Sequence, residues 1–549
     1  TWAEDLAARE VRRYIYLRTG RVFPIKSAPS ASANAWTIMV ATKGSALLAG
    51  FQDDAVALAV RSLKSQSYLL RTRPGRAQPG QLARSASTGQ TLLLVGGDDT
   101  GTLYAAYRFA EQLGVRFYLD GDVIPDQQAE WIFPQLDIRE SPLFNLRGIQ
   151  PFHDFPEGPD WWNRDDYLAI VGQLPRLRMN FFGLHTYPEE RPNAEPTVWI
   201  GFPNDVGRNG DVQFGYPSSY QNTLRGNWGY TAQKTGAFVF GADQLFERDA
   251  FGPEALGEWL PQPATPDACN EVFNRTAATL ADTFSFAHRL GVKTCVGTET
   301  PLVLPKAVQA RARALGKDPA DEATVRELYE GIFRRAAAAY PLDYYWFWTP
   351  EGWTWSGVKP EEIEATTNDL FSAIAAWKAA HPPFALAMCG WVLGPPQDRA
   401  MFDKLLPKDI AVSCINRQVG YTPVDAGFNE VTNRSKWAIP WMEDDPALSS
   451  PQLWVGRMRR DAADALRYGC NGLMGIHWRT RILGPNVSAL AQAAWTQHPW
   501  AEPYKPIETF AETKDFYSDW ARHHFGEEAG AQAGRIFEKM DCHLPIPSV

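Results

Sequence analysis

The pattern of hydrophobic and polar positions divides the chain into three consecutive parts. Within residues 1–140, AEDLAAREVRRYIYLRTG has the periodicity of an amphipathic helix, while WTIMVAT and the glycine-bounded TLLLVGG are typical of strands. A further helix is expected to begin at a cap formed by Asp99 or Thr100 and to end at Gly114. This order predicts a small N-terminal α/β domain.

Residues 141–500 alternate short apolar runs with long helical stretches. The runs that predict strands are eight in number and cover residues 145–150, 179–185, 292–298, 343–349, 384–390, 410–416, 436–442 and 472–478. Repeated βα units of this kind predict a (β/α)8 TIM barrel. The segment 186–265 is too long for an ordinary βα loop, so it is expected to cover the mouth of the barrel. Residues 501–549 predict a short C-terminal helical segment.

Composition narrows the classes of function. The chain is 45% hydrophobic and 21% charged, as expected of a folded protein, and its net charge of −9 argues against nucleic acid as a partner. No run of about 18 apolar residues predicts a membrane span. The start at Thr1 lacks the charged and apolar regions of a signal peptide, which leads us to expect a periplasmic or secreted protein whose signal has been removed. The oligomeric state stays open, with a homo-oligomer as one alternative.

Polar side chains stand at or just beyond the ends of most of the predicted strands, where the catalytic groups of (β/α)8 enzymes lie. These candidates are Asp154, His185, Glu299, Glu351, Asn416, Arg417, Glu443, Asp444, His477, Arg479 and Arg481. A single carboxylate of this kind is more often salt-bridged or capping than catalytic. Several of them together, accompanied by tryptophans, are typical of a carbohydrate site, where rings stack on sugars and acids cleave the glycosidic bond.

Glu351 follows an aromatic strand in the segment DYYWFWTPEGWTWSG. Rings such as Trp348 and Trp353 would partly desolvate its carboxyl group, which raises a carboxyl pKa and keeps the proton that a general acid donates. The same rings could form a platform for a sugar. Alternatively, some of them belong to the core of the barrel.

Glu443 is the main candidate for the second carboxylate, with Asp444 close behind it. Such a group either activates water or attacks the sugar directly, and the distance between the two carboxyl groups distinguishes these outcomes. Arg479 and Arg481, two residues apart, could form a fork for an anionic group of the substrate. Equally, they could neutralise Glu443 or Asp444. The remaining candidates would bind the substrate, and His185 and Asn416 are the ones expected to hold its hydroxyl groups. A lone histidine such as His477 is more often structural.

The segment LLLVGGDDTGTLYAAYRFAEQLGVRFY resembles the small domain that precedes the barrel in family 67 and family 115 α-glucuronidases and in family 20 β-hexosaminidases. TPEGWTWSG is similar to the segment of family 67 enzymes that carries the general acid, and WMEDD to the region that supplies their base. This resemblance implies Glu351 as acid and Glu443 as base. Family 20 enzymes carry an Asp-Glu pair after strand four, whereas Pro350 precedes Glu351 here, which counts against hexosaminidase activity.

Together these features predict an exo-acting glycoside hydrolase that releases a terminal sugar, with an acidic sugar slightly favoured, from an oligosaccharide or polysaccharide-derived substrate. Two alternatives stay open. One is a β-N-acetylhexosaminidase-like or sialidase-like exo-glycosidase, and the other is a non-catalytic carbohydrate-binding protein on the same scaffold. No cofactor and no metal are expected from the motifs.

Overall fold

The structure is a computed structural model that describes most of the chain. The described residues are 1–27, 36–51, 55–74, 89–153, 158–159, 162–188, 194–219, 263–418, 420–444, 452–502 and 505–542. Asp154 and much of the predicted 186–265 loop therefore lie outside the described residues.

The N-terminal domain is built on a four-stranded mixed sheet. Its strands are β1 (Thr37–Thr42), β2 (Tyr68–Pro74), β3 (Gln90–Gly96) and β6 (Asp137–Glu140), in the order β1-β3-β2-β6. α1 (Trp2–Thr19) and α3 (Asp99–Gln112) pack on one face, and α2 (Ala55–Arg61) belongs to a separate hydrophobic cluster on the other. A hairpin of β4 (Arg116–Tyr118) and β5 (Gly121–Val123) follows α3. Asp98, rather than Asp99 or Thr100, caps α3, because its carboxylate accepts from the backbone N–H of Gly101 at 2.7 Å.

Eight parallel strands close the predicted barrel. They are β7 (Leu146–Pro151), β8 (Phe181–Thr186), β9 (Lys293–Glu299), β10 (Tyr344–Trp348), β11 (Ala385–Gly390), β12 (Ala411–Ile415), β13 (Lys436–Ile439) and β14 (Gly472–His477). Each overlaps one predicted run, so all eight predicted strands and the (β/α)8 class are confirmed. Parallel strands covered on both faces have near-continuous apolar sequences, which explains why the runs were visible.

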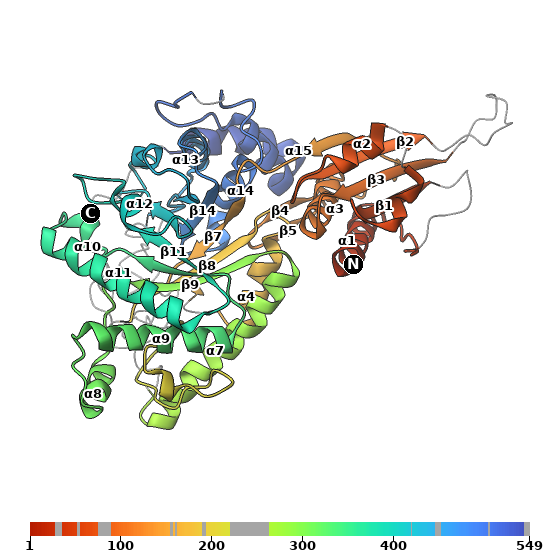
Figure 1. Ribbon diagram of the computed structural model, residues 1–549. Coiled ribbons are helices and arrows are strands. Elements are labelled where there is room, and N and C mark those ends of the chain that lie inside the picture. The colour runs from red at the N-terminus through yellow and green to blue at the C-terminus, as the bar shows by residue number, and fades with distance from the viewer. Residues whose placement is uncertain are drawn as a thin grey trace, which may run out of the picture.

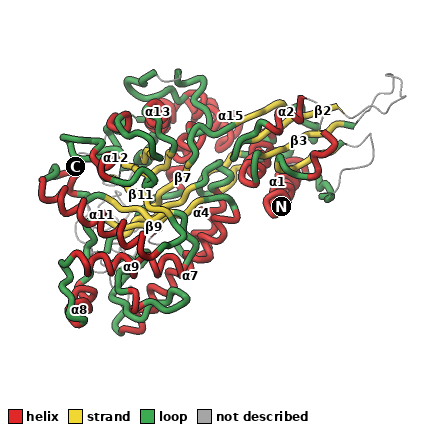
Figure 2. Tube along the Cα trace, viewed as in Figure 1, coloured by secondary structure: helices red, strands yellow, loops and turns green. Residues whose placement is uncertain are grey.

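Helices surround the barrel and connect its strands (Figures 1 and 2). They are α4 (Arg164–Gln173), α7 (Pro266–Arg289), α8 (Lys306–Ala314), α9 (Glu322–Ala339), α10 (Gly352–Trp355), α11 (Pro360–Ala380), α12 (Met401–Leu405), α13 (Val455–Arg467) and α14 (Gly484–Ala493). Short 3-10 turns lie at η1 (Ala46–Phe51), η3 (Pro203–Asp205), η5 (Ala426–Asn429) and η7 (Arg481–Leu483). None of the helices in the described part of the chain is long and apolar enough to cross a membrane.

The C-terminal helix α15 (Lys514–Met540) joins the two domains, as Figure 1 shows. A backbone with positive φ at Gly526 divides it into two parts, and it lies within the predicted C-terminal helical segment 501–549. Arg116 of the N-terminal hairpin makes two 2.8 Å hydrogen bonds to the Asp519 carboxylate of α15. At the other end, the Asp541 carboxylate accepts from the first backbone N–H groups of α13, at 2.8 and 2.9 Å. α15 therefore fixes the start of a barrel helix.

Inside the barrel, tryptophans fill space that glycines leave. A side chain at Gly183 of β8 would collide with the Trp346 ring, and one at Gly297 of β9 would collide with both the Trp346 ring and its carbonyl group. The Trp346 indole is fully buried and donates to the Leu184 carbonyl at 3.1 Å. This interior forms a hydrophobic cluster separate from the one between the strands and the surrounding helices.

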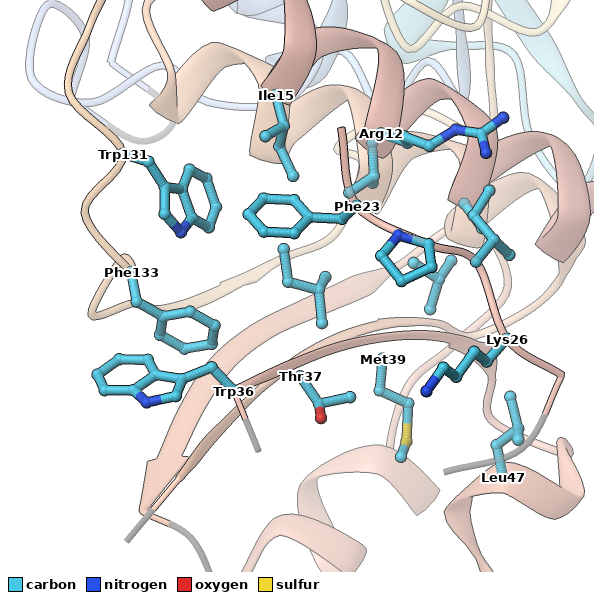
Figure 3. Close-up of a pocket in the computed structure, with 16 residues that line it drawn as sticks. Arg12, Ile15, Phe23, Lys26, Trp36, Thr37, Met39, Leu47, Trp131 and Phe133 are labelled. Atoms are coloured by element: carbon cyan, nitrogen blue, oxygen red, sulfur yellow. The ribbon is translucent and has the colours of Figure 1, made fainter. Parts of the chain in front are cut away.

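The N-terminal domain also contains a cavity of about 300 Å³ between α1 and β1 (Figure 3). Two aromatic pairs line it, Phe23 with Trp131 and Trp36 with Phe133, at ring-centroid distances of 5.2 and 4.8 Å. None of the predicted site residues lines this cavity, so the candidate site must be sought at the barrel.

Candidate active site

The carboxyl ends of the eight parallel strands meet at one mouth. Glu299 is the last residue of β9, His477 is the last residue of β14, and His185 is one residue from the end of β8. The other described candidates lie at the end of β10 or beyond β10, β12, β13 and β14. Direct contacts join Glu443 to Arg479 and His185 to Trp348. Asp154 belongs to the residues that the structure does not describe.

Glu351 is partly buried at the start of α10, immediately beyond β10. The Tyr187 hydroxyl donates to its Oε2 at 3.2 Å, and the Trp355 indole N–H donates to its Oε1 at 3.3 Å. Trp355 is exposed, so Glu351 stands between the aromatic interior and solvent. This is the placement that a proton donor to an incoming substrate requires.

Glu299 is buried on the neighbouring strand. Its Oε1 accepts a 2.9 Å hydrogen bond from the Trp391 indole N–H. Tyr187 and Trp391 were missed in the sequence, although each lies two residues beyond a recognised strand residue, His185 and Cys389. In an extended chain, residues two apart point to the same side, so this rule would have found both.

Stacked rings close the interior of the barrel below these acids. Phe152 stacks on His185 with ring centroids 4.8 Å apart, and His185 meets Trp348 edge-on at 4.9 Å. Trp391 packs edge-on against Trp348 at 5.6 Å. Trp348 has no exposed surface, so it forms part of the aromatic wall rather than an open platform. This agrees with the alternative that some of these rings belong to the core.

Trp353 does not reach this chamber, contrary to the prediction that it forms a sugar platform. It is 3% exposed and stacks on Phe402 of α12, within the outer hydrophobic cluster. The helical turn of α10 begins at Gly352, so the extended alternation of β10 cannot be continued to this residue.

Glu443 is fully buried and paired with Arg479. Its Oε1 accepts from the backbone N–H groups of Trp478 and Arg479 at 2.8 and 2.7 Å, and its Oε2 accepts from the Arg479 guanidinium at 2.5 Å. Burial raises the pKa of Glu443, although these three donors favour its charged form. The predicted alternative in which Arg479 neutralises Glu443 is thus the one that the structure contains.

The predicted fork of Arg479 and Arg481 is wrong. β14 ends at His477 and a 3-10 turn begins at Arg481, so the two side chains do not share one side of an extended chain. The Arg481 side chain is 92% exposed and lies 3.9 Å from Asp120, next to the N-terminal hairpin.

His477 is fully buried and bonded through Nδ1 to the Arg479 carbonyl at 2.7 Å. Burial lowers its pKa to about 4, so it is neutral at physiological pH. It therefore holds the loop after β14, in line with the expectation for a lone histidine. On the β12 side, the Asn416 amide donates to the Thr422 carbonyl at 3.3 Å, and the Arg417 carbonyl accepts from the Thr422 hydroxyl at 2.7 Å.

Several buried polar atoms at or below the mouth have no hydrogen-bond partner among the described residues. They are both amide atoms of Gln150, the indole N–H groups of Trp348 and Trp441, and Oδ1 of Asp444. Buried polar groups in native proteins are nearly always satisfied by protein, water or ligand. Their concentration here favours a site that holds polar molecules. The described residues contain no cluster of side chains suited to a metal ion.

No protein-family model matches this sequence, and no curated protein matches it either. The solved structures that share its fold include three glycoside hydrolases. A family GH115 4-O-methyl-α-glucuronidase with specificity for decorated arabinogalactans has 12% identity and a TM-score of 0.55, covering 98% of this chain and 59% of its own. A family 89 glycoside hydrolase from Clostridium perfringens has 11% identity and a TM-score of 0.52, covering 98% and 52%. A family GH138 enzyme targeting pectin rhamnogalacturonan II has 10% identity and a TM-score of 0.50, covering 98% and 55%.

The architecture is the one that these glycoside hydrolases share. The predicted likeness to family 115 is confirmed for the fold, and the chain spans between 52% and 59% of the length of these three structures.

Proposed function

We propose that the protein is an exo-acting glycoside hydrolase that releases a terminal sugar from a glycan. The observation that carries this proposal is the placement of Glu351, a partly buried carboxyl group held by Tyr187 and Trp355 above an aromatic chamber. Buried polar atoms beside that chamber that have no hydrogen-bond partner in the described part of the chain fit a ligand rich in hydroxyl groups. The fold shared with glycoside hydrolases supports the same reading.

In this mechanism Glu351 protonates the glycosidic oxygen of the leaving group. The second carboxylate must approach the sugar from the opposite face, which favours β13 over β9, the direct neighbour of β10. We keep Glu443 as the proposed base or nucleophile, because its three N–H donors oppose the rise in pKa that burial causes and so favour the ionised form that both roles require. Glu299 would bind the substrate from the β9 side.

The experiment that tests the proposal is a turnover screen of the wild-type protein. Its panel contains aryl glycosides of glucuronic acid, N-acetylhexosamines, sialic acid and neutral sugars, together with acidic oligosaccharides. Release of one terminal sugar supports the proposal and identifies the substrate class. Sugar binding without any turnover would favour the alternative of a non-catalytic carbohydrate-binding protein.

Replacing Tyr187 by Phe tests the hydrogen bond to Glu351. Loss of the hydroxyl donor should lower kcat/KM by about threefold to tenfold, the value of one hydrogen bond. Because the donor favours the charged carboxylate, its removal should also shift the basic limb of the pH–rate profile to higher pH. The matched control is Tyr344→Phe. Tyr344 is the first residue of β10, at the end of the strand away from Glu351, so this change should leave the pH–rate profile unchanged. An unshifted profile in Tyr187→Phe would contradict a role of Glu351 as the acid.

A further inference from the structure

A second group of buried charges lies beside the mouth, on the β12 and β13 side. We call it the Arg457 cluster and define it as Tyr421, Asp444, Trp454, Arg457 and Asp461. Tyr421 follows β12, Asp444 follows β13, and Arg457 stands in the first turn of α13 with Asp461 one turn later. The three charged side chains are between 1% and 4% exposed. Among them, the sequence had singled out Asp444 alone.

Contacts tie the cluster together. The Arg457 guanidinium lies over the rings of Trp454 and Tyr421, 3.7 and 4.2 Å from their centroids. The Tyr421 hydroxyl is 3.5 Å from Oδ2 of Asp444. Residues four apart on a helix share one face, which places Asp461 beside Arg457. The Asp541 carboxylate at the end of α15 accepts hydrogen bonds from the first turn of α13, so the backbone that carries Arg457 is fixed in place.

Each of the three charged groups keeps one buried polar atom without a hydrogen-bond partner among the described residues. These atoms are Nη1 of Arg457, Oδ2 of Asp461 and Oδ1 of Asp444. An unsatisfied buried polar group destabilises the fold, and more so when the group is charged. Three such atoms in one cluster indicate a common partner that donates and accepts hydrogen bonds.

The donor and acceptor properties of these three atoms indicate which chemical group could pair with them. A carboxylate could accept from Arg457 but has no hydrogen to donate to the aspartate oxygens, and an ammonium group would be repelled by Arg457. Hydroxyl groups accept from a guanidinium and donate to carboxylates. Burial raises the pKa of Asp461 to about 8 and raises that of Asp444, and a hydroxyl group can pair with either form of an aspartate.

We propose that the Arg457 cluster is a subsite that binds adjacent hydroxyl groups of a sugar residue. Arg457 donates to one hydroxyl, while Asp444 and Asp461 pair with its neighbour. This proposal rests on the proposed function, because it describes how the mouth of the same barrel binds its substrate. It also implies that the edge of the sugar facing β12 and β13 is neutral, even where the sugar carries a carboxylate elsewhere.

The test is isothermal titration calorimetry in the Glu351→Gln background, which separates binding from turnover. The probes are glucose, galactose, glucuronic acid and galacturonic acid. Arg457→Met and Asp461→Asn should each weaken the sugar that binds best by about tenfold or more, and should weaken a neutral sugar and its uronic acid by similar factors. The matched control is Asp464→Asn, a buried residue of the same helix that is paired with Arg467 at 2.7 Å. It should bind like the parent.

The outcomes separate this proposal from the proposed function. Selective loss of uronic acid binding in Arg457→Met would show that Arg457 binds a carboxylate, and it would contradict the proposed hydroxyl-binding subsite. Unchanged binding in both variants, or no binding of any probe to the parent, would also overturn it, whatever the turnover screen shows. If sugar binding depends on Arg457 but the wild-type protein shows no turnover, the proposed subsite is supported and the proposed hydrolase activity is contradicted. Circular dichroism checks the fold, and the isosteric Asp461→Asn keeps the test valid if Arg457→Met fails to fold.

Discussion

Replacing Glu351 by Gln should reduce hydrolysis by about 10²–10⁴-fold, the contribution of a positioned general acid. Glutamine keeps the size of the side chain but cannot give up a proton to the leaving group. The fold should persist, because Glu351 is only partly buried and Tyr187 and Trp355, which donate to it among the described residues, are neutral. The measurement compares kcat/KM of the variant and wild type on the substrate found in the screen.

The leaving group provides the internal control. A dinitrophenolate leaves without protonation, so Glu351→Gln should lose little activity on a dinitrophenyl glycoside and much on the natural substrate. Glu361→Gln, which changes an exposed residue on α11, should behave as wild type on both. Equal losses on the two leaving groups would assign Glu351 to binding rather than proton transfer, and full activity on both would remove it from the site.

The barrel was predictable because its strands are covered on both faces. A strand such as β11 or β12 is buried along nearly its whole length, so its sequence is a continuous apolar run and its position shows directly. The ends of the strands were equally visible, since polar residues follow them. Glu299 and Glu351 were found in this way, on strands that are neighbours in the barrel.

Side-chain directions beyond the strands were less predictable, because they depend on where the extended backbone stops. The turn at α10 carries Trp353 outward to Phe402, and the turn at η7 carries Arg481 to the surface. Pairings between distant segments were also invisible. Tyr187 and Glu351 are 164 residues apart in the sequence, and only the closed barrel brings them together.

Replacing Arg479 by Met should destabilise the barrel by about 3–5 kcal/mol, the cost of leaving a buried charge without its partner. Arg479 is the only charged side chain that hydrogen-bonds to Glu443 among the described residues, and Glu443 has no exposed surface. The comparison is urea unfolding followed by tryptophan fluorescence. Arg481→Met is the matched control, because it makes the same chemical change two residues away on a side chain that is 92% exposed. It should change stability by less than about 0.5 kcal/mol.

The dependence on pH distinguishes a lost charge partner from lost packing. Burial already raises the pKa of Glu443, and without Arg479 that pKa should rise further. A carboxyl group whose pKa is raised by folding stabilises the protein while protonated, and this contribution is lost as pH rises through the folded-state pKa. The loss of stability in Arg479→Met should therefore be larger at about pH 8 than at about pH 5. Adding Glu443→Gln to this variant removes the buried charge and should recover part of the lost stability at high pH. A loss of stability that is constant with pH and unchanged by Glu443→Gln would instead mean that Arg479 acts through its packing alone.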